Sequence, residues 1–534
     1  MGKVVSKLKE PLIYACNVTQ LIAGRKRKRE DDESSEDISN ALEKSLQSPK
    51  RKKLLTTPQY IYQALFKEEK NSDVAVLANG KVWNLHKVYL CQSPYFSSMF
   101  NGCWREFDQD FIHIKILDPK ITVESLEKVF GSFYSDEIVI EPVNVISVLA
   151  TATLFQLESI IEKCAEVMIE TTNAETAVPY YEAACQYGVQ TVKNASFNWL
   201  LVNLLSFYSK HTKWLRPIGN TLMTEIVASP ELYVMQTEFS LYSLLRLWMY
   251  LKIFPEYDPE SKTNKEEECS PRQYFANRTD STPFLRTPEG MPFEATFNSL
   301  RLQHLLIHHI DMKIILNDNI IPKEWLHTYL LGHWNSILKV DHAGDESIVD
   351  VKEDVFYKNC MRCGRVLPES SFQKWRWTGF NFGLDLVLTA EGRLLTIRRH
   401  HKAENERLLS LQVKRQFMIR VTVASLNKQR QVVHSQSTGI KTLNLEKNEE
   451  ISLMIFENKL EYPLLVSVNL LIVNTDFNTA PISKEDSTMP PSPVTISEIG
   501  ANSDSPVTHL SASSISISLG CNNAQLRVIL KMYT

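Results

Sequence analysis

The sequence predicts a multidomain α+β protein. We expect a mixed α/β domain, a helical region and a β-rich, sandwich-like domain between a charged arm and a serine-rich tail. Three observations lead to this fold class. The 534 residues correspond to about three folded units at roughly 150 residues per domain. The hydrophobic pattern changes along the chain from mixed to helical and then to alternating. Hydrophobic residues make up 43% and charged residues 23%, which is the balance of a globular protein.

Composition and motif content argue against several functional classes. The 17 glycines are about half the usual share, which leaves little material for phosphate-binding loops. The sequence has no P-loop, dinucleotide-binding, zinc-protease or nucleophile-elbow motif, so we expect no catalytic residue and no cofactor. A formal charge of −3 gives no bulk attraction to nucleic acid. Nine scattered cysteines and no leading secretory segment indicate a reducing compartment with free thiols.

Residues 1–56 are predicted to form a disordered arm that carries two cellular addresses. The segment Met1 to Ser6 matches the N-myristoylation pattern, with Gly2 as the acceptor. Nearby lysines would supply the basic second signal that a single lipid chain needs to hold a protein at a membrane surface. The alternative is that Gly2 is an ordinary residue of the arm.

Two basic clusters in the arm resemble a bipartite nuclear import signal. Their Lys and Arg side chains stay extended and available because like charges cannot pack into a core. The alternative is a solvated, charge-balanced linker. The clusters are Arg25, Lys26, Arg27, Lys28 and Arg29, followed by Lys50, Arg51, Lys52 and Lys53.

Residues 57–160 show the pattern of a mixed α/β domain. A helix begins at Thr57, an Asn79-Gly80 turn joins two short strands, and Pro94 divides the next helical segment. A further strand is predicted from Phe111 to Ile116, and two apolar helices follow it.

Three segments of the chain resemble the germ cell-less protein family. They are QYIYQALF, LHKVYLCQSPYFSSMFNGCWRE and, far downstream, WRWTGFNFG. The resemblance implies a BTB domain over 57–160, a BACK-like helical region over 161–350 and the family's own C-terminal domain over 351–474. It also implies a homodimer that brings protein cargo to a cullin-3 ubiquitin ligase.

The same resemblance points to a cullin-docking turn. Adaptors of the ligase class resemble one another in a short turn with an exposed aromatic residue and a carboxylate, which together form a small hot spot. Here Trp104, Arg105 and Glu106 would form this turn, next to Phe100. The alternative is that Trp104 folds into the core and Glu106 is an ordinary surface charge.

Dimerisation would use the first helix of the BTB domain against its copy. Two copies would present two cargo sites to one ligase, which raises avidity without new contacts. The alternative is that this helix face covers its own domain. The residues concerned are Tyr60, Ile61, Ala64 and Leu65.

Beyond the BTB domain, consecutive apolar helices indicate a packed bundle, with a linker expected at 256–290. Beyond Tyr357 the pattern alternates, which is typical of a β-sandwich. The aromatic residues of WRWTGFNFG would form either a buried cluster or an exposed cargo groove. Residues 475–534 have the composition of a disordered Ser/Thr/Pro-rich tail. It ends in the short apolar run Leu526 to Met532, for which an added strand is an open alternative. The predicted strands are Leu384 to Leu388, Leu394 to Ile397, Phe417 to Val423, Ile451 to Ile455 and Leu464 to Val473.

Cys360 and Cys363 form a lone CxxC pair, which with His400 and His401 would supply four zinc ligands. A second pair at the usual spacing is missing, and the family pattern involves only Cys363. We therefore predict no metal site.

The sequence and the resemblance together predict a non-catalytic cullin-3 substrate adaptor that acts in germ-cell formation. Its expected location is the nucleus and the inner face of the nuclear envelope, with the plasma membrane as a second location through N-myristoylation. Expected partners are cullin-3, a second copy, nuclear-envelope proteins and an unidentified protein cargo, for which a membrane signalling receptor is one hypothesis. The alternative is a nuclear-envelope scaffold or transcriptional co-regulator without a ligase role.

Overall fold

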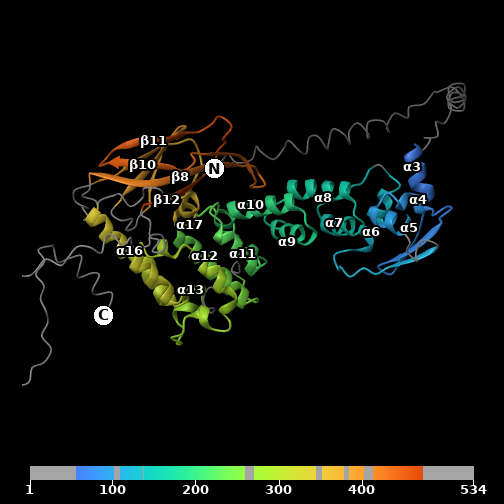
Figure 1. The fold of residues 1–534 in the computed structure, drawn as a ribbon, viewed down its shortest axis with the longest axis horizontal. Coiled ribbons are helices and arrows are strands. Elements are labelled where there is room, and N and C mark those ends of the chain that lie inside the picture. The colour runs from blue at the N-terminus through green and yellow to red at the C-terminus, as the bar shows by residue number, and fades with distance from the viewer. Residues whose placement is uncertain are drawn as a thin grey trace, which may run out of the picture. The chain divides into compact units, whose positions relative to one another are not determined.

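The computed structural model of the chain describes residues 56–101, 109–135, 137–258, 270–343, 351–377, 384–401 and 413–472. Along these ranges an α/β part comes first, helices follow, and β-strands come last (Figure 1), which confirms the predicted fold class. No helix in them has both the length and the apolar character needed to cross a membrane. Gly2, both basic clusters and the tail lie outside the described residues, so their roles stay predictions.

The first domain contains a three-stranded sheet in the order β2-β1-β3. Strands β1 (Val74–Ala78) and β2 (Lys81–Leu85) pair antiparallel, and β3 (Phe111–Ile114) lies parallel to β1. Asn79 and Gly80 both have positive φ, 48° and 77°. This is the two-residue turn conformation whose twist fits a hairpin, so the predicted hairpin is confirmed.

Helices pack against this sheet in a shared core, in which Val76 and Phe96 are fully buried. Thr56 caps the first helix, and its backbone N–H donates to Oε1 of Gln59 at 3.3 Å. The predicted break near Pro94 is present, since proline has no N–H with which to continue the preceding helix. The helices are α3 (Thr57–Ile61), the π-helical turn η1 (Tyr62–Lys67), α4 (Lys87–Leu90), α5 (Pro94–Asn101), α6 (Val123–Ser132) and α7 (Val145–Leu154).

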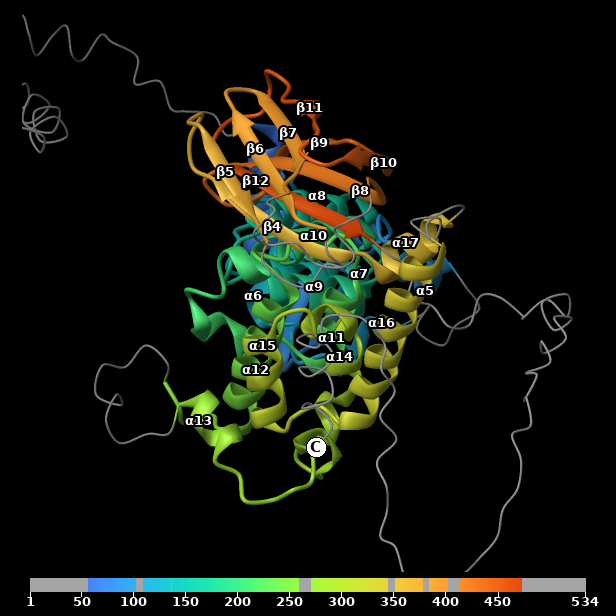
Figure 2. The ribbon, with the colours of Figure 1, turned by 90° about the vertical axis from the view of Figure 1, so that its left-hand side faces the viewer.

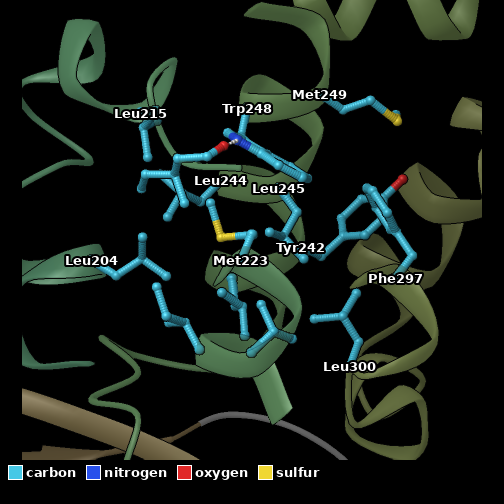
Figure 3. Packing of buried hydrophobic residues seen from close by; sticks show 14 of the residues in the cluster. Leu204, Leu215, Met223, Tyr242, Leu244, Leu245, Trp248, Met249, Phe297 and Leu300 are labelled. Atoms are coloured by element: carbon cyan, nitrogen blue, oxygen red, sulfur yellow. Dashed lines mark hydrogen bonds between the residues drawn. The ribbon is translucent and has the colours of Figure 1, made fainter. Parts of the chain in front are cut away.

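The middle of the chain is a series of helices, most of which pack around one large core. Trp248 is fully buried in it and donates its indole N–H to the carbonyl oxygen of Ile218 at 3.1 Å. Figure 3 shows Leu204, Met223 and Phe297, from three other helices, in the same cluster. The helices are α8 (Glu158–Glu170), α9 (Ala177–Tyr187), α10 (Gln190–Ser206), η3 (Thr212–Leu215), α11 (Asn220–Ala228), α12 (Glu238–Ile253), α13 (Pro271–Ala276), η5 (Phe284–Arg286), η6 (Met291–Phe293), α14 (Glu294–Asn298), η7 (Leu302–Leu305), α15 (His309–Asp318), α16 (Lys323–Ala343) and α17 (Glu353–Asn359).

The prediction of a linker over 256–290 was wrong for its second half. Residues 259–269 lie outside the described residues, but α13 and η5 are folded against the helical core. Phe275 and Phe284 are buried, and their rings meet edge to face with centroids 5.1 Å apart. The sequence misled because proline and polar residues separate these aromatics and leave no periodic pattern.

Two antiparallel sheets form the β-rich domain as the layers of a sandwich (Figure 2). One sheet has the order β10-β8-β12-β4, with β9 also paired to β8, and the other has the order β11-β7-β6-β5. Side chains from both sheets share one core. The strands are β4 (Met361–Leu367), β5 (Gln373–Arg376), β6 (Leu386–Glu391), β7 (Leu394–Arg399), β8 (Lys414–Leu426), β9 (Val432–Ser437), β10 (Lys441–Glu446), β11 (Glu450–Ile455) and β12 (Leu464–Leu471).

Four of these strands, β4, β5, β9 and β10, were not predicted. β4 carries a fully buried arginine, Arg362, and β9 is almost entirely exposed, so neither shows the apolar alternation of a half-buried strand. In the WRWTGFNFG segment, Trp375 is 6% exposed and belongs to the core, as the first alternative proposed. Residues 378–383 of this segment lie outside the described residues.

Candidate functional site

Helix α5 leads into the segment predicted to dock a cullin. Ser93, just before α5, donates its hydroxyl to the carbonyl oxygen of Phe155 at 2.6 Å. Phe96 stacks on Phe155, with ring centroids 5.1 Å apart, so α5 is fixed to the end of α7. Phe100, one of the four predicted docking residues, is 6% exposed and stacks on Phe96. Its side chain supports α5 from within the domain and offers almost no surface to a partner.

The predicted docking turn itself lies within residues 102–108, which the structure does not describe. The domain holds the chain on both sides of this segment. Asn101 is the last residue of α5, and the carbonyl oxygen of Asp110 accepts the N–H of Ala75 in β1 at 2.8 Å. The assignment of Trp104, Arg105 and Glu106 to cullin docking therefore stays a prediction.

The residues predicted for dimerisation lie on α3 and η1. Tyr60 is 60% exposed, and Ile61 and Leu65 are half-buried. Ala64 is buried and packs inside its own domain, as the alternative interpretation of this helix proposed. The other three leave surface that a second copy can cover, and their role in dimerisation stays a prediction.

A buried ion pair that the sequence did not predict joins the helical region to the β-rich domain. Arg362 of β4 faces Glu238 of α12, with Nε 3.3 Å from Oε2 and a second bond from Nη2 to Oε1. Nη1 donates to the carbonyl oxygens of Val227 and Ser229 at 2.7 and 2.8 Å. Burial alone would raise the pKa of Glu238, but the charges of Arg362 and Arg301 outweigh it and hold that pKa below its usual value.

Arg301 extends this junction toward the start of β4. Its guanidinium donates to the carbonyl oxygens of Cys360 and Tyr357, and its Nη1 lies 3.0 Å from Sγ of Cys360. Nε2 of His304 lies 2.8 Å from the carbonyl oxygen of Asn359. Burial lowers the pKa of His304 to about 4, so its ring is neutral at physiological pH. We name this set of contacts, from Glu238 and Arg362 to Arg301 and His304, the polar junction.

The turn between β8 and β9 makes a second contact with the helical region, which we name the hairpin contact. Trp199 of α10 donates its indole N–H to the carbonyl oxygen of Gln429 at 3.0 Å. Asn203 donates to the carbonyl oxygen of Arg430 at 3.0 Å and accepts from Nε of Arg430 at 2.7 Å. Since more than 220 residues separate these partners, the sequence alone carries no signal for the contact.

The two cysteines considered as metal ligands make other contacts. Sγ of Cys360 accepts a hydrogen bond from Arg301, and Sγ of Cys363 donates to the carbonyl oxygen of Val468 at 3.6 Å. Burial raises the pKa of the Cys363 thiol well above its usual value, which keeps it protonated. Among the described residues, no group of three or more His, Cys, Asp or Glu side chains is placed to hold a metal ion.

Comparison with known proteins places this architecture in a family. Residues 62–172 match the BTB/POZ domain. The chain is 51% identical to Protein germ cell-less of Drosophila melanogaster, over 97% of this chain and 94% of the relative. It is 36% identical to human Germ cell-less protein-like 1, over 81% of this chain and 84% of the relative. A shorter match, 26% identical over 34% of this chain and 30% of the relative, is to mouse Kelch repeat and BTB domain-containing protein 8. The chain therefore belongs to the germ cell-less family of BTB-domain proteins.

Proposed function

We propose that this protein is a non-catalytic substrate adaptor of a cullin-3 ubiquitin ligase. Its BTB domain dimerises and docks the cullin, and its β-rich domain holds the protein cargo. The observation that supports this proposal best is the attachment of the β-rich domain through both the polar junction and the hairpin contact. An adaptor has to present cargo at a fixed distance from the docking domain, and two separate contacts resist rotation about either one.

The similarity to a Kelch repeat and BTB domain-containing protein gives independent support. That name combines a BTB domain with a repeat domain that forms a separate β-rich unit. In the present chain a β-sandwich follows the BTB domain and the helices. Both proteins thus combine a BTB domain with a further β-rich domain.

Family membership extends the proposal to germ-cell formation, with a membrane signalling receptor as a candidate cargo. Myristoylation at Gly2 would bring the adaptor to the membrane that holds such a cargo. The basic clusters favour a second candidate function, that of a nuclear-envelope scaffold or transcriptional co-regulator, because they match a nuclear import signal.

Co-precipitation of cullin-3 with the full chain tests the adaptor proposal. The double variant Trp104→Ala, Glu106→Lys should reduce bound cullin-3 by more than about tenfold, since the loss of hot-spot residues costs 2 kcal/mol or more. A matched control is Phe372→Ala, Glu369→Lys, which removes an aromatic side chain and reverses a charge in the same way at exposed positions of the β-rich domain. Circular dichroism should show both variants folded. The absence of binding by the parent chain would favour the scaffold function. Equal binding by the parent and the docking variant would show that cullin-3 binds elsewhere than at Trp104 and Glu106.

Fluorescence imaging of variants tests the two localisation signals, which are myristoylation at Gly2 and the two basic clusters. Gly2→Ala should release the chain from membranes while nuclear import persists. Replacement of the nine basic residues of the two clusters with alanine should have the opposite effect. If Gly2→Ala leaves the distribution unchanged in fluorescence images, the lipid anchor has no role.

A further inference from the structure

Edge strands of a sheet expose unpaired backbone N–H and C=O groups, which folded proteins usually protect from pairing with other chains. Two edge strands of the sandwich, β4 and β11, are protected by contacts within the chain. In β4 the carbonyl oxygen of Gly364 accepts the backbone N–H of Gln236 at 2.9 Å. In β11 the carbonyl oxygen of Leu453 accepts a hydrogen bond from Nζ of Lys441 at 3.0 Å. The chain itself therefore covers part of each of these edges.

Charged side chains protect the edges formed by β5 and β10. β5 has four residues, of which Lys374 and Arg376 are exposed. In β10 the exposed Glu446 pairs with Lys414 at 3.1 Å. A strand that added to either edge would have to remove water from these charges, which is unfavourable.

β9 pairs with β8, as β10 does, and lies with β10 on one side of the sandwich (Figure 2). Its six residues, VVHSQS, include no Lys, Arg, Asp, Glu or Pro, and five of them are exposed. Just after β9, Thr438 donates its backbone N–H to the carbonyl oxygen of Val421 in β8 at 2.9 Å. Because backbone groups alternate along an antiparallel strand, those of Ser435 and Ser437 point away from β8, and they have no hydrogen-bond partner in the part of the chain that the structure describes. We name the backbone of Val432–Ser437 the β9 edge.

The β9 edge is held by the rest of the protein at both ends. Before it, Nε2 of Gln431 donates to the carbonyl oxygen of Ile169 in α8 at 2.7 Å, which extends the hairpin contact. Near its other end, Nε2 of Gln436 donates to the carbonyl oxygen of Ile455 at 2.9 Å, and Oε1 accepts the backbone N–H of Glu457 at 3.1 Å. The strand is thus ordered before a partner arrives, so binding costs little conformational entropy on this side.

We propose that the β9 edge binds an extended segment of the cargo protein by strand addition. In this mode main-chain hydrogen bonds give affinity and alternate side chains give specificity. Outward N–H and C=O groups at the spacing of a strand complement another extended backbone, so the ligand is a protein segment. That this segment belongs to the cargo rests on the proposed function.

The surroundings of the β9 edge define the segment further. Six residues of a strand span about 20 Å. Val433 is 52% exposed at the start of β9, and Ile455 is 67% exposed beside its other end. The one irregularity of the β8–β9 pairing lies between Ser425 and Leu426, at the start of β9. A matching segment thus has about six residues, with uncharged side chains in the middle and an apolar side chain near each end.

Peptide selection on the full chain tests the proposal. Ser435→Pro removes one outward N–H but keeps the bonds to β8, so the variant should fold as the parent does. Phage that display random linear peptides of about ten residues are depleted on Ser435→Pro and then selected on the parent. In fluorescence polarisation the selected peptides should bind the parent at least about tenfold more tightly than Ser435→Pro, because the variant leaves a peptide carbonyl unpaired. Ser435→Ala, the matched control, keeps the N–H and should bind like the parent.

A second measurement depends only on the parent protein. N-methyl groups placed one at a time along a selected peptide remove single N–H donors. In strand addition alternate N–H groups face the β9 edge, so methylation should weaken binding about tenfold at every second position and have little effect between them. Binding through side chains alone produces no such alternation.

The proposal is overturned if no peptide is enriched, if the parent and Ser435→Pro bind the selected peptides equally, or if N-methylation shows no alternation. It is also overturned if Ser435→Pro lowers the oligomeric state in analytical ultracentrifugation, since a second copy then occupies the edge. Co-precipitation of cullin-3 keeps the proposed function separate. A parent that binds the peptides but not cullin-3 refutes the adaptor function, whereas a parent that binds cullin-3 but no peptide refutes the role of the β9 edge alone.

Discussion

Arg362 of β4 and Glu238 of α12 form an ion pair in which neither side chain is more than 1% exposed. Burial of two charges is unfavourable unless further bonds satisfy them. Here the arginine also donates to two backbone carbonyl oxygens, and the carboxylate also accepts the backbone N–H of Arg301 at 3.2 Å. Such directional bonds allow one orientation of the β-rich domain on the helical region, which apolar packing alone does not specify.

Removal of the arginine should destabilise the chain strongly. Arg362→Met leaves the Glu238 carboxylate buried without its partner and should lower the free energy of unfolding by about 3–5 kcal/mol in urea titrations followed by tryptophan fluorescence. Arg376→Met is the matched control, since its pair with Asp385 is exposed and contributes at most about 1 kcal/mol. Equal losses of unfolding free energy in the two variants would show that the buried pair contributes no more to stability than the exposed pair.

Gly364 permits the close approach of β4 to the loop between α11 and α12. A Cβ atom added there would lie 2.9 Å from Cε2 of Tyr233 and 2.9 Å from the carbonyl oxygens of Val234 and Val466. Two of these contacts are backbone, which cannot move cheaply, so Gly364→Ala should cost roughly 1–3 kcal/mol. The control Gly219→Ala meets no atom within 4 Å and should cost less than about 1 kcal/mol, the preference for glycine at a helix N-cap. Thermal unfolding of both variants makes the comparison.

The hairpin contact predicts a difference between two substitutions at one position. Arg430 has φ of 61°, which glycine adopts freely and alanine does not. Both Arg430→Gly and Arg430→Ala lose the hydrogen bonds from the charged guanidinium to Asn203 and Ser206, which should lower the free energy of unfolding by about 1.5–3 kcal/mol. The alanine variant should be about 1 kcal/mol less stable than the glycine variant because of its unfavourable φ. Faster hydrogen exchange at Asn427 to Gln431 should follow the same order. A glycine variant that exchanges like the parent would mean that the guanidinium does not hold the turn.

Stability should fall when the pH drops from 6.5 toward 4. Burial lowers the pKa of both His304 and His333 from 6.5 to about 4, so the folded chain binds fewer protons than the unfolded chain in this range. The two neutral histidines contribute fully to the free energy of unfolding above pH 6.5. Between pH 6.5 and 4 this contribution falls by up to about 1.4 kcal/mol per pH unit for each ring. Urea midpoints at pH 7 and 5 should differ less for His333→Gln than for the parent. His434→Gln is the control, because His434 is exposed, and it should show the same difference between the two midpoints as the parent. If His333→Gln also shows the parent's difference, burial of His333 does not cause the loss of stability at low pH.

Local signals in the sequence predict local structure well. The Asn79-Gly80 turn and the break at Pro94 depend on single residues whose backbone preferences are strong. The polar junction depends instead on a pairing across 124 residues. In the sequence, Arg362 is an ordinary charged residue inside CMRC, and its position in a strand is hidden because the partner that makes its burial favourable lies in a distant helix.

In the candidate site, too, local features could be predicted from the sequence, whereas features that depend on distant contacts could not. Tyr60 is exposed and Ala64 is buried because one side of their helix meets the domain core. The 3.6-residue period shows which residues share a side, but it does not show which side meets the core. The same holds for α16, where Leu331, Trp334 and Leu338 are exposed, while the face that packs includes Ser336 and His333.

The sequence separation between Trp199 and Gln429 also determines when their contact can form during protein synthesis. The two are 230 residues apart, and a ribosome that adds about 5–20 residues per second needs on the order of 10–50 s to pass from one to the other. Glu238 lacks its Arg362 partner until 124 further residues have been added, and the Trp199 indole lacks its acceptor over the whole interval. A chain whose translation stops before β4 contains neither partner. Completion of the last strands thus hides the features by which chaperones and proteases recognise an unfinished product.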